Sequence, residues 1–398
     1  MTRPRVLLAW EYGAGFGHSM RLARIARTLG PRFDAVLAAP DGAPAPDATS
    51  FRDAVRVERP QHFAQERRLP GRRRIASYAD VLERLGFADS AFVAAQVGLW
   101  ERVMAHVRPD AVVADYAPAL LLAARGRVPT IAVGNGYTLP PAELARYPIW
   151  LQGAPCVDQD VMLDAVNRGL DRAGRDALGT IPAIFRADRS RCMTLPVLDP
   201  FGRGGGELCG VEGAGHEAGG GDEVFAYLSD ARRDRVGAVL EALRASGRRA
   251  IVVAPGLADS AASLATERIE VRSDMMGHEE IARRANMLVH GGGHDMMAFG
   301  ALLGVPQVCF VLDLEKLLHA RRLEQRGVCA VVPGMDASRL SEAIAQASEA
   351  SPAARELAME LKSWRDARPI TRVASDVREL LDEAGTEPEA GNGAVGEI

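Results

Sequence analysis

The chain has 398 residues, which at about 150 residues per domain predicts two or three domains with hydrophobic cores of their own. Apolar residues make up 47% and charged residues 25%, a composition that excludes a disordered or fibrous protein. The 48 Lys and Arg against 52 Asp and Glu give a net charge of −4, so there is no overall basic field to bind a nucleic acid. The sequence predicts a globular protein that does not bind nucleic acid.

The cysteine pattern and the hydropathy of the sequence predict in which compartment the protein resides. The five cysteines are scattered and form no C-x-x-C pair, so neither a disulfide framework nor a zinc knuckle is expected. No apolar signal segment precedes the first strand-like run, and no run of about 18 apolar residues occurs. We expect a cytoplasmic protein without a transmembrane segment. Peripheral membrane contact and the oligomeric state are left open.

The first half of the chain alternates strand-like and helix-like segments. Short apolar runs bounded by turn residues predict buried parallel strands at 5–10, 35–39, 111–114 and 130–133, with amphipathic helices between them. This pattern predicts an α/β domain over residues 1–200. Residues 201–222 then become dense in glycine and lose all periodicity, which predicts a linker.

The alternation restarts in the second half. Strands are predicted at 224–228, 250–254, 287–290, 307–311 and 328–332, and helices at 230–245 and 315–326, within a second α/β domain over 223–352. Residues 353–384 show only helical periodicity, with Pro369 separating two helices, and residues 385–398 form a tail that we expect to be disordered. In such α/β proteins, ligands bind outside the carboxyl ends of the strands.

The first candidate site follows the first strand, in EYGAGFGHSMRLARIARTL. Gly13, Gly15 and Gly17 permit a tight turn, but their spacing is not the G-x-G-x-x-G of a dinucleotide site. His18 begins the following helix and, with an ordinary pKa near 6.5, is suited to act as a general base. Asp115, at the end of a later strand, can orient its other nitrogen. The alternative, equally open on spacing alone, is that both residues only cap helices.

The second candidate site lies in ANMLVHGGGHDMMAFGALLGVP. This run predicts a buried strand, a turn over Gly291 to Gly293 and a helix whose free N–H groups can bind a phosphate. A plain tight turn is the alternative, and a metal site of His290, His294 and Asp295 is less favoured because glycines interrupt the spacing. G-x-S-x-G, Walker A and H-E-x-x-H motifs are absent from the sequence.

Together these motifs resemble the GT-B glycosyltransferases that use nucleotide sugars, a group that includes UDP-glucuronosyltransferases and the peptidoglycan N-acetylglucosaminyltransferase. The resemblance spans nearly the whole chain. GFGHSMRLARIARTL resembles the acceptor-half turn, which implies that His18 is the base and Asp115 its partner. LVHGGGHDMM resembles the diphosphate-binding segment, with His290 at the phosphate-contacting position. EKLLHARRLEQRG resembles D/E-Q-x-x-N-A-x-R, with Glu315 at the sugar-recognising position.

Three positions depart from the family pattern. The phosphate-binding Ser or Thr falls on Asp295 or on Met296, depending on the direction of the count, because the loop is one residue longer here. The ribose-binding Glu falls on Ala298 or Phe299, and Lys316 replaces the sugar-binding Gln. An ionised carboxylate beside a diphosphate is repulsive unless a nearby cation offsets it.

The resemblance implies an α/β protein of the GT-B fold, with two Rossmann-like doubly wound domains facing a cleft and C-terminal crossover helices. It implies inverting, metal-independent sugar transfer from a UDP- or dTDP-linked donor to a hydroxyl of a small-molecule, lipid or peptide acceptor, without a further cofactor. The alternatives are a partner subunit that binds nucleotide or acceptor without turnover, and a nucleotide-sugar epimerase or hydrolase. The predicted donor-binding residues are Gly15, Gly17, His290, Gly291, Gly292, Gly293, His294, Asp295, Glu315 and Lys316, and no metal ligand is predicted.

Overall fold

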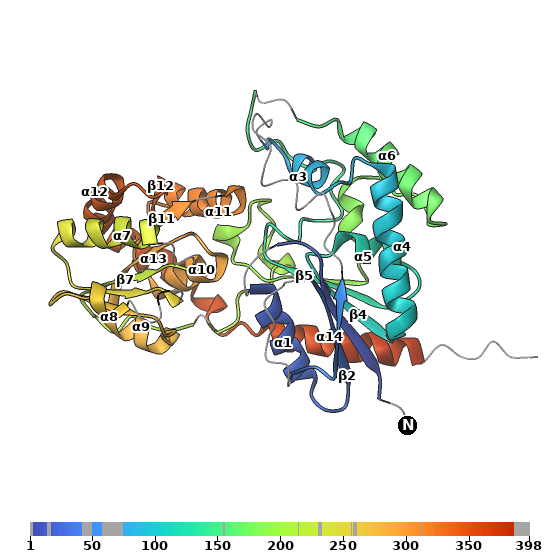
Figure 1. Cartoon of the computed structure of the whole chain (residues 1–398), viewed down its shortest axis with the longest axis horizontal. Helices are drawn as coiled ribbons and strands as arrows, with labels where there is room; N and C mark the ends of the chain where they lie inside the picture. Colours follow the sequence, from blue (N-terminus) through green and yellow to red (C-terminus); the bar gives the residue numbers. More distant parts are fainter. Residues whose placement is uncertain are drawn as a thin grey trace, which may run out of the picture. The chain divides into compact units, whose positions relative to one another are not determined.

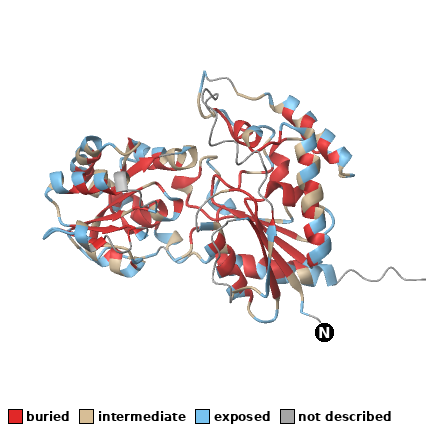
Figure 2. Cartoon of the chain, in the orientation of Figure 1, coloured by how far each residue is buried: buried red, intermediate tan, exposed pale blue. Residues whose placement is uncertain are grey.

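The computed structural model describes residues 3–13, 17–41, 50–57, 75–153, 156–213, 215–229, 233–255, 257, 261–311 and 313–385. These residues form two compact units (Figure 1). The first contains the chain up to Gly134, Thr138–Arg191 and the chain from Ile370, and the second contains Asn135–Tyr137 and Cys192–Pro369. Figure 2 shows that the strands of each unit are buried while the outward sides of the helices are exposed.

A six-stranded sheet forms the centre of the first unit, in the order β3-β2-β1-β4-β5-β6 over the described residues. β1 is apolar after Arg5 and pairs in parallel with both β2 and β4, so the strand order reverses between β1 and β4. This is the order of a Rossmann-like sheet, whose ligands bind at such a reversal. The strands are β1 (Arg5–Trp10), β2 (Asp34–Pro40), β3 (Asp53–Val57), β4 (Ala111–Asp115), β5 (Thr130–Gly134) and β6 (Arg189–Cys192).

Helices cover this sheet, and the last helix of the chain belongs to the same unit. It begins at Pro369, as the break predicted there requires, and buries Val373 and Val377 completely. Arg191 of β6 holds Asp376 of this helix through two bonds of 2.7 and 2.5 Å. The helices are α1 (Gly17–Leu29), α3 (Tyr78–Arg84), α4 (Ser90–Val107), α5 (Pro118–Ala124), α6 (Gln159–Arg172) and α14 (Pro369–Gly385).

The second unit repeats this plan, with the strand order β12-β11-β10-β7-β8-β9 over the described residues. Alternate residues of β7 enter two different cores, Phe225 one and Val224 the other, so both faces of the sheet are covered by helices. The order reverses between β10 and β7. The strands are β7 (Glu223–Tyr227), β8 (Ala250–Val253), β9 (Ile269–Arg272), β10 (Ala285–His290), β11 (Gln307–Val311) and β12 (Cys329–Pro333).

The helices of the second unit pack on both sheet faces. α10 contacts α13 and α11, and α7 contacts α12. Along the chain they are α7 (Arg233–Ser246), α8 (Ala261–Leu264), α9 (His278–Arg284), α10 (His294–Leu303), α11 (Leu314–Gln325), α12 (Ala337–Ala347) and α13 (Ser351–Glu360). In the described residues of the chain, no helix combines the length and the apolar character needed to span a membrane.

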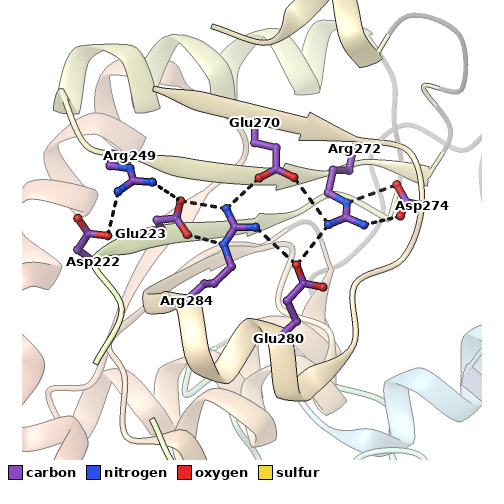
Figure 3. Close-up of polar contacts among 8 residues, drawn as sticks. All are labelled: Asp222, Glu223, Arg249, Glu270, Arg272, Asp274, Glu280 and Arg284. Carbon is purple, nitrogen blue, oxygen red and sulfur yellow. Dashed lines mark hydrogen bonds and ion pairs between the residues drawn. The ribbon is translucent and has the colours of Figure 1, made fainter. Parts of the chain in front are cut away.

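A network of eight charged side chains links the amino end of β7 with β9 and α9 (Figure 3). Arg284, just before β10, donates to Glu223 at 2.6 Å and to Glu270 at 2.8 Å. The hydrogen bond from Arg284 lowers the pKa of the nearly buried Glu223, although burial alone would raise it. The network thus extends from the amino end of β7 to the carboxyl end of β9, where Arg272 pairs with Asp274. Its members are Asp222, Glu223, Arg249, Glu270, Arg272, Asp274, Glu280 and Arg284.

The glycine-rich run predicted as a linker packs into the second unit. A Cβ at Gly215 would lie 2.1 Å from the carbonyl oxygen of Arg365, and one at Gly221 would lie 1.9 Å from that of Arg284. Leu208, within this run, also forms an isolated parallel β-bridge with Cys192. The glycines thus allow backbone to pack directly on backbone. Residues 386–398, where a disordered tail is predicted, lie outside the described residues.

Candidate active site

Both predicted motifs follow strands at which the strand order reverses. In the first unit, β1 leads toward His18 and the neighbouring β4 ends in Asp115, and Trp10 and Asp115 are paired in register. In the second unit, β10 ends in His290 beside Tyr227 of β7. These are the positions where open α/β sheets bind ligands. The structure therefore brings each predicted set of residues to a plausible binding edge of its own unit.

The predicted base and its partner are in contact. His18 Nδ1 lies 3.1 Å from Oδ1 of Asp115, whose side chain is completely buried, whereas the imidazole is 13% exposed. A carboxylate only accepts hydrogen bonds, so its approach to Nδ1 favours the neutral tautomer with the proton on Nδ1 and the lone pair on Nε2. The pair thus has the arrangement that a histidine general base requires.

Arg21 also binds this carboxylate. Its Nη1 lies 2.9 Å from Oδ1 and 2.7 Å from Oδ2 of Asp115. Burial by itself would raise the pKa of Asp115, but the positive charge of Arg21, followed by the interaction with His18, holds that pKa below its ordinary value. The carboxylate is therefore ionised at neutral pH and shared between two basic side chains.

Two aromatic rings lie nearly parallel to the imidazole. The ring centroids of Trp10 and Tyr116 are 5.9 and 6.2 Å from that of His18, with interplanar angles of 25° and 27°. Tyr116 has φ +49°, a left-handed backbone that costs a non-glycine residue about 1–3 kcal/mol and is concentrated at functional sites. The rings restrict the orientation of the imidazole and can stabilise its positive charge after it takes up a proton.

Gly13 leaves room for the reactive nitrogen. It has φ +100°, and a Cβ there would lie only 2.4 Å from Nε2 of His18. A side chain at this position would collide with the imidazole. Gly17, predicted to bind the donor, is the first residue of α1 and is exposed, with no atom near its missing Cβ. Gly15 lies outside the described residues.

In the second unit, His290 organises the glycine turn. The N–H of Gly292 donates to its Nδ1 at 3.1 Å, so Nε2 carries the proton and donates to Oε1 of Gln307 at 2.9 Å. Burial lowers the pKa of His290 to about 4, which keeps the ring neutral. The family resemblance implies a direct phosphate contact for His290, but both ring nitrogens already have partners in the protein. This geometry favours a positioning role.

The glycine turn leads into the amino end of α10, which no side chain caps. Gly293 is the N-cap residue there. The first N–H groups of a helix have no partners within the helix, and its dipole favours an anion at this end. Gly292 has φ +75°, and a Cβ on it would lie 3.1 Å from Cβ of Lys316, so only glycine lets the lysine approach so closely. A Cβ on Gly291 would lie 3.1 Å from the Phe310 ring.

At the start of α10, His294 is buried and Asp295 is exposed. Nε2 of the buried His294 lies 2.7 Å from Oγ1 of the fully buried Thr194, while its Nδ1 lies 3.2 Å from Oδ1 of Asp295. The Asp295 side chain is 76% exposed, so water screens its charge. Ala298 and Phe299, the two positions to which counting assigns a ribose contact, are completely buried in the core.

The start of α11 supplies the remaining predicted residues. Glu315 accepts a hydrogen bond of 2.7 Å from Nδ2 of Asn135, a contact that the sequence does not indicate. Lys316 Nζ lies 2.7 Å from Oδ2 of Asp313, the N-cap residue of the same helix. The stem of Lys316 also packs against the glycine turn at Gly292, so this side chain brings a positive charge to the region of the predicted phosphate site.

His319, on the same helix, is buried without a hydrogen-bond partner among the described residues. This holds for both of its ring nitrogens, and its ring centroid lies 5.2 Å from that of His294. Burial, followed by the influence of His294 and Arg322, holds the pKa of His319 well below its ordinary value. An unsatisfied buried polar group costs roughly 1–3 kcal/mol.

We therefore predict that His319→Leu raises the free energy of unfolding at pH 7 by about 1 kcal/mol. The gain should increase by about another 1 kcal/mol at pH 5.5. The reason is that the unfolded wild type binds a proton at His319 below pH 6.5 and the folded protein does not. Urea denaturation at both pH values measures this difference, with the exposed His106→Leu as the control. Equal or lower stability of His319→Leu at both pH values would contradict the prediction.

The described residues contain no group of three His, Cys, Asp or Glu side chains arranged to bind a metal ion. A scan against protein-family models finds no match. A search of curated protein sequences finds none either.

Solved structures, in contrast, match over nearly the whole chain. The calicheamicin glycosyltransferase CalG4 is 16% identical, with a TM-score of 0.66 and coverage of 96% of this chain and 99% of that one. The spinosyn rhamnosyltransferase SpnG is 16% identical, with a TM-score of 0.62 and coverage of 94% and 99%. The glycosyltransferase VinC, solved in complex with dTDP, is 16% identical, with a TM-score of 0.62 and coverage of 95% and 100%. The two Rossmann-like sheets and these similarities show that the chain has the GT-B fold of these glycosyltransferases.

Proposed function

We propose that the protein is an inverting glycosyltransferase that moves a sugar from a nucleoside diphosphate to a hydroxyl of an acceptor. The observation that carries this proposal is the His18–Asp115 pair. A buried carboxylate 3.1 Å from Nδ1 fixes the imidazole, and the absence of a side chain at Gly13 leaves Nε2 unblocked. The pair lies at the strand-order reversal of a sheet with a Rossmann-like order.

In the proposed reaction, Nε2 of His18 takes the proton of the acceptor hydroxyl. The freed oxygen attacks the anomeric carbon of the donor sugar, and the bond from that carbon to the diphosphate oxygen breaks. The electron pair of this bond leaves with the nucleoside diphosphate, and the configuration at the anomeric carbon is inverted. Asp115 stabilises the imidazolium that forms, and it stays ionised throughout.

The glycine turn of the second unit is the proposed diphosphate site. The amino end of α10, which no side chain caps at Gly293, and the dipole of this helix stabilise the negative charge that develops on the leaving group. His290 holds the turn in shape through Gly292, and the ammonium of Lys316 adds a positive charge. The proposal assigns this stabilisation to the chain itself and uses neither a metal nor a cofactor.

A UDP- or dTDP-linked sugar is the proposed donor. VinC and SpnG, which share the fold, were solved with dTDP and thymidine diphosphate, and SpnG was also solved with the spinosyn aglycone. A small molecule with a free hydroxyl is therefore the proposed class of acceptor. All five cysteines are free, which supports a reducing compartment such as the cytoplasm.

Calorimetric titration with dTDP, UDP, GDP and thymidine tests the donor site first. We expect dTDP or UDP to bind and thymidine to bind at least tenfold more weakly, because the turn recognises the diphosphate. Ligand at about 100 times its Kd also stabilises the fold by roughly 2.7 kcal/mol, which a thermal-shift assay detects. Equal binding of dTDP and thymidine, or no binding of any diphosphate, would overturn the donor assignment. NMR of the product then reports whether the anomeric configuration is inverted.

A further inference from the structure

Arg21 is a charged residue of the first site that the mechanism above does not use. It lies three positions after His18 on α1, so both side chains leave the same face of the helix. Its guanidinium contacts both carboxylate oxygens of Asp115, at 2.9 and 2.7 Å, and its side chain is only 13% exposed. The same Asp115 Oδ1 lies 3.1 Å from His18 Nδ1. One buried carboxylate thus serves two basic groups.

We propose that Arg21 is a positioning residue whose fixed positive charge keeps His18 neutral, so that the imidazole enters the reaction with Nε2 ready to accept a proton. This inference rests on the proposed role of His18 as the base. It concerns the charge of the imidazole, however, which can be measured without any acceptor or donor.

The argument is a balance of charges around one carboxylate. An arginine stays protonated at neutral pH, so Arg21 offsets part of the negative charge of Asp115. A protonated His18 would place a second positive charge beside this carboxylate, and Asp115 then stabilises that charge less than it would without Arg21. With Asp115 alone, a buried carboxylate would instead favour the imidazolium, typically by 1–3 pH units. An imidazolium has no lone pair and cannot act as a base.

Other groups near the imidazole do not supply this charge. Tyr116 and Trp10 present aromatic rings to His18. Burial, followed by the nearby Glu11, raises the pKa of Tyr12 well above its ordinary value, so this phenol stays neutral. Residues 14–16, Ala, Gly and Phe, carry no ionisable side chain. The charge facing His18 from α1 and β4 is therefore that of Arg21 and Asp115.

The charge of His18 can be followed by NMR in protein with isotope-labelled histidine, with His18→Gln used to assign its signals. The key variant is Arg21→Met, which removes the charge but keeps an apolar stem of similar length. Arg21→Lys keeps the charge. The matched control is Arg24→Met, which removes a positive charge from an exposed position of the same helix. Thermal unfolding of each variant shows that it is folded.

We expect the titration midpoint of His18 to rise by about one pH unit in Arg21→Met, and to stay at the wild-type value in Arg21→Lys and Arg24→Met. An unchanged midpoint in folded Arg21→Met would overturn the proposal. So would an equal rise in Arg21→Lys, because the charge would then not be the cause.

A second pair of variants covers the case in which Arg21→Met does not fold because it leaves a buried carboxylate. Asp115→Asn keeps Arg21 beside an uncharged partner, and the double variant Arg21→Met with Asp115→Asn removes both charges. We expect the His18 midpoint to be about one pH unit higher in the double variant than in Asp115→Asn. Equal midpoints in these two proteins would overturn the proposal.

The pH dependence of transfer separates this proposal from the function on which it rests. We expect the acid limb of kcat/KM to move upward in Arg21→Met together with the NMR midpoint, and Arg21→Lys to restore it. A moved midpoint in a protein without transfer activity would support the role of Arg21 in setting the charge and overturn the proposed function. A moved midpoint with an unmoved acid limb would show that His18 is not the base, and would thus overturn the proposal that Arg21 prepares the base.

Discussion

His18→Ala should lower kcat for sugar transfer by about 10²–10⁴-fold, the usual contribution of a general base. Among the described ionisable side chains that contact Asp115, His18 alone has a nitrogen that is free to accept a proton from a hydroxyl at neutral pH. The loss should appear in kcat and in kcat/KM alike, because the interaction forms fully only in the transition state. Initial rates at saturating donor and acceptor measure it.

The same variant should bind dTDP or UDP with unchanged affinity, since the proposed diphosphate site belongs to the other unit. Calorimetric titration of the nucleotide therefore serves as the internal control for folding. His106→Ala, at an exposed position of α4, controls for the loss of a histidine elsewhere in the unit. Transfer at the wild-type rate by folded His18→Ala would rule out the assigned base.

Gly293→Asp should weaken binding of the nucleoside diphosphate by about 10–100-fold while leaving the fold as stable as before. Gly293 has the extended backbone of an N-cap residue, with φ −62° and ψ 135°, and nothing lies within 4 Å of its missing Cβ. Aspartate is a favourable N-cap residue, so its carboxylate should bind the same N–H groups that the diphosphate needs and repel the diphosphate as well. Calorimetric titration and urea denaturation measure the two effects.

Gly293→Ser is the matched variant, because serine caps the helix without adding a charge. Its affinity for the nucleotide should lie between those of the wild type and Gly293→Asp. If Gly293→Asp bound dTDP or UDP as tightly as the wild type, the diphosphate would not sit at the start of α10. A large loss of stability would point to a structural effect, which the urea measurement would reveal directly.

The positions of the central strands along the chain could be predicted from the sequence because these strands are buried on both faces. Their continuous apolar runs match β1, β4 and β11 within one residue at each end. The strands that the sequence did not predict, β3, β6 and β9, all lie at sheet edges in the described topology. Their segments DAVRV, RSRC and IEVR contain charged residues that are not buried, so no apolar run marks them.

In the candidate site, too, some contacts could be predicted from sequence patterns and others could not. The contact of His18 with Asp115 follows from two strand-to-helix turns on neighbouring strands, a rule that sequence pattern can use. Arg21 could have been found from its spacing of three residues from His18 on an amphipathic helix. The bonds from Thr194 to His294 and from Asn135 to Glu315 join residues at least 100 positions apart, and no local pattern indicates them.

The close backbone packing of the glycine-rich run has a consequence for building chimaeric enzymes. An exchange of donor halves between glycosyltransferases that cuts just after Gly221 would separate Gly215 and Gly221 from the backbone of Arg365 and Arg284, on which they pack. Cuts just before Cys192 and just after Pro369 would instead transfer this run with its partners, as one cassette. Residues Asn135–Tyr137, which contact the same unit, would then be the remaining junction to match between the two parents.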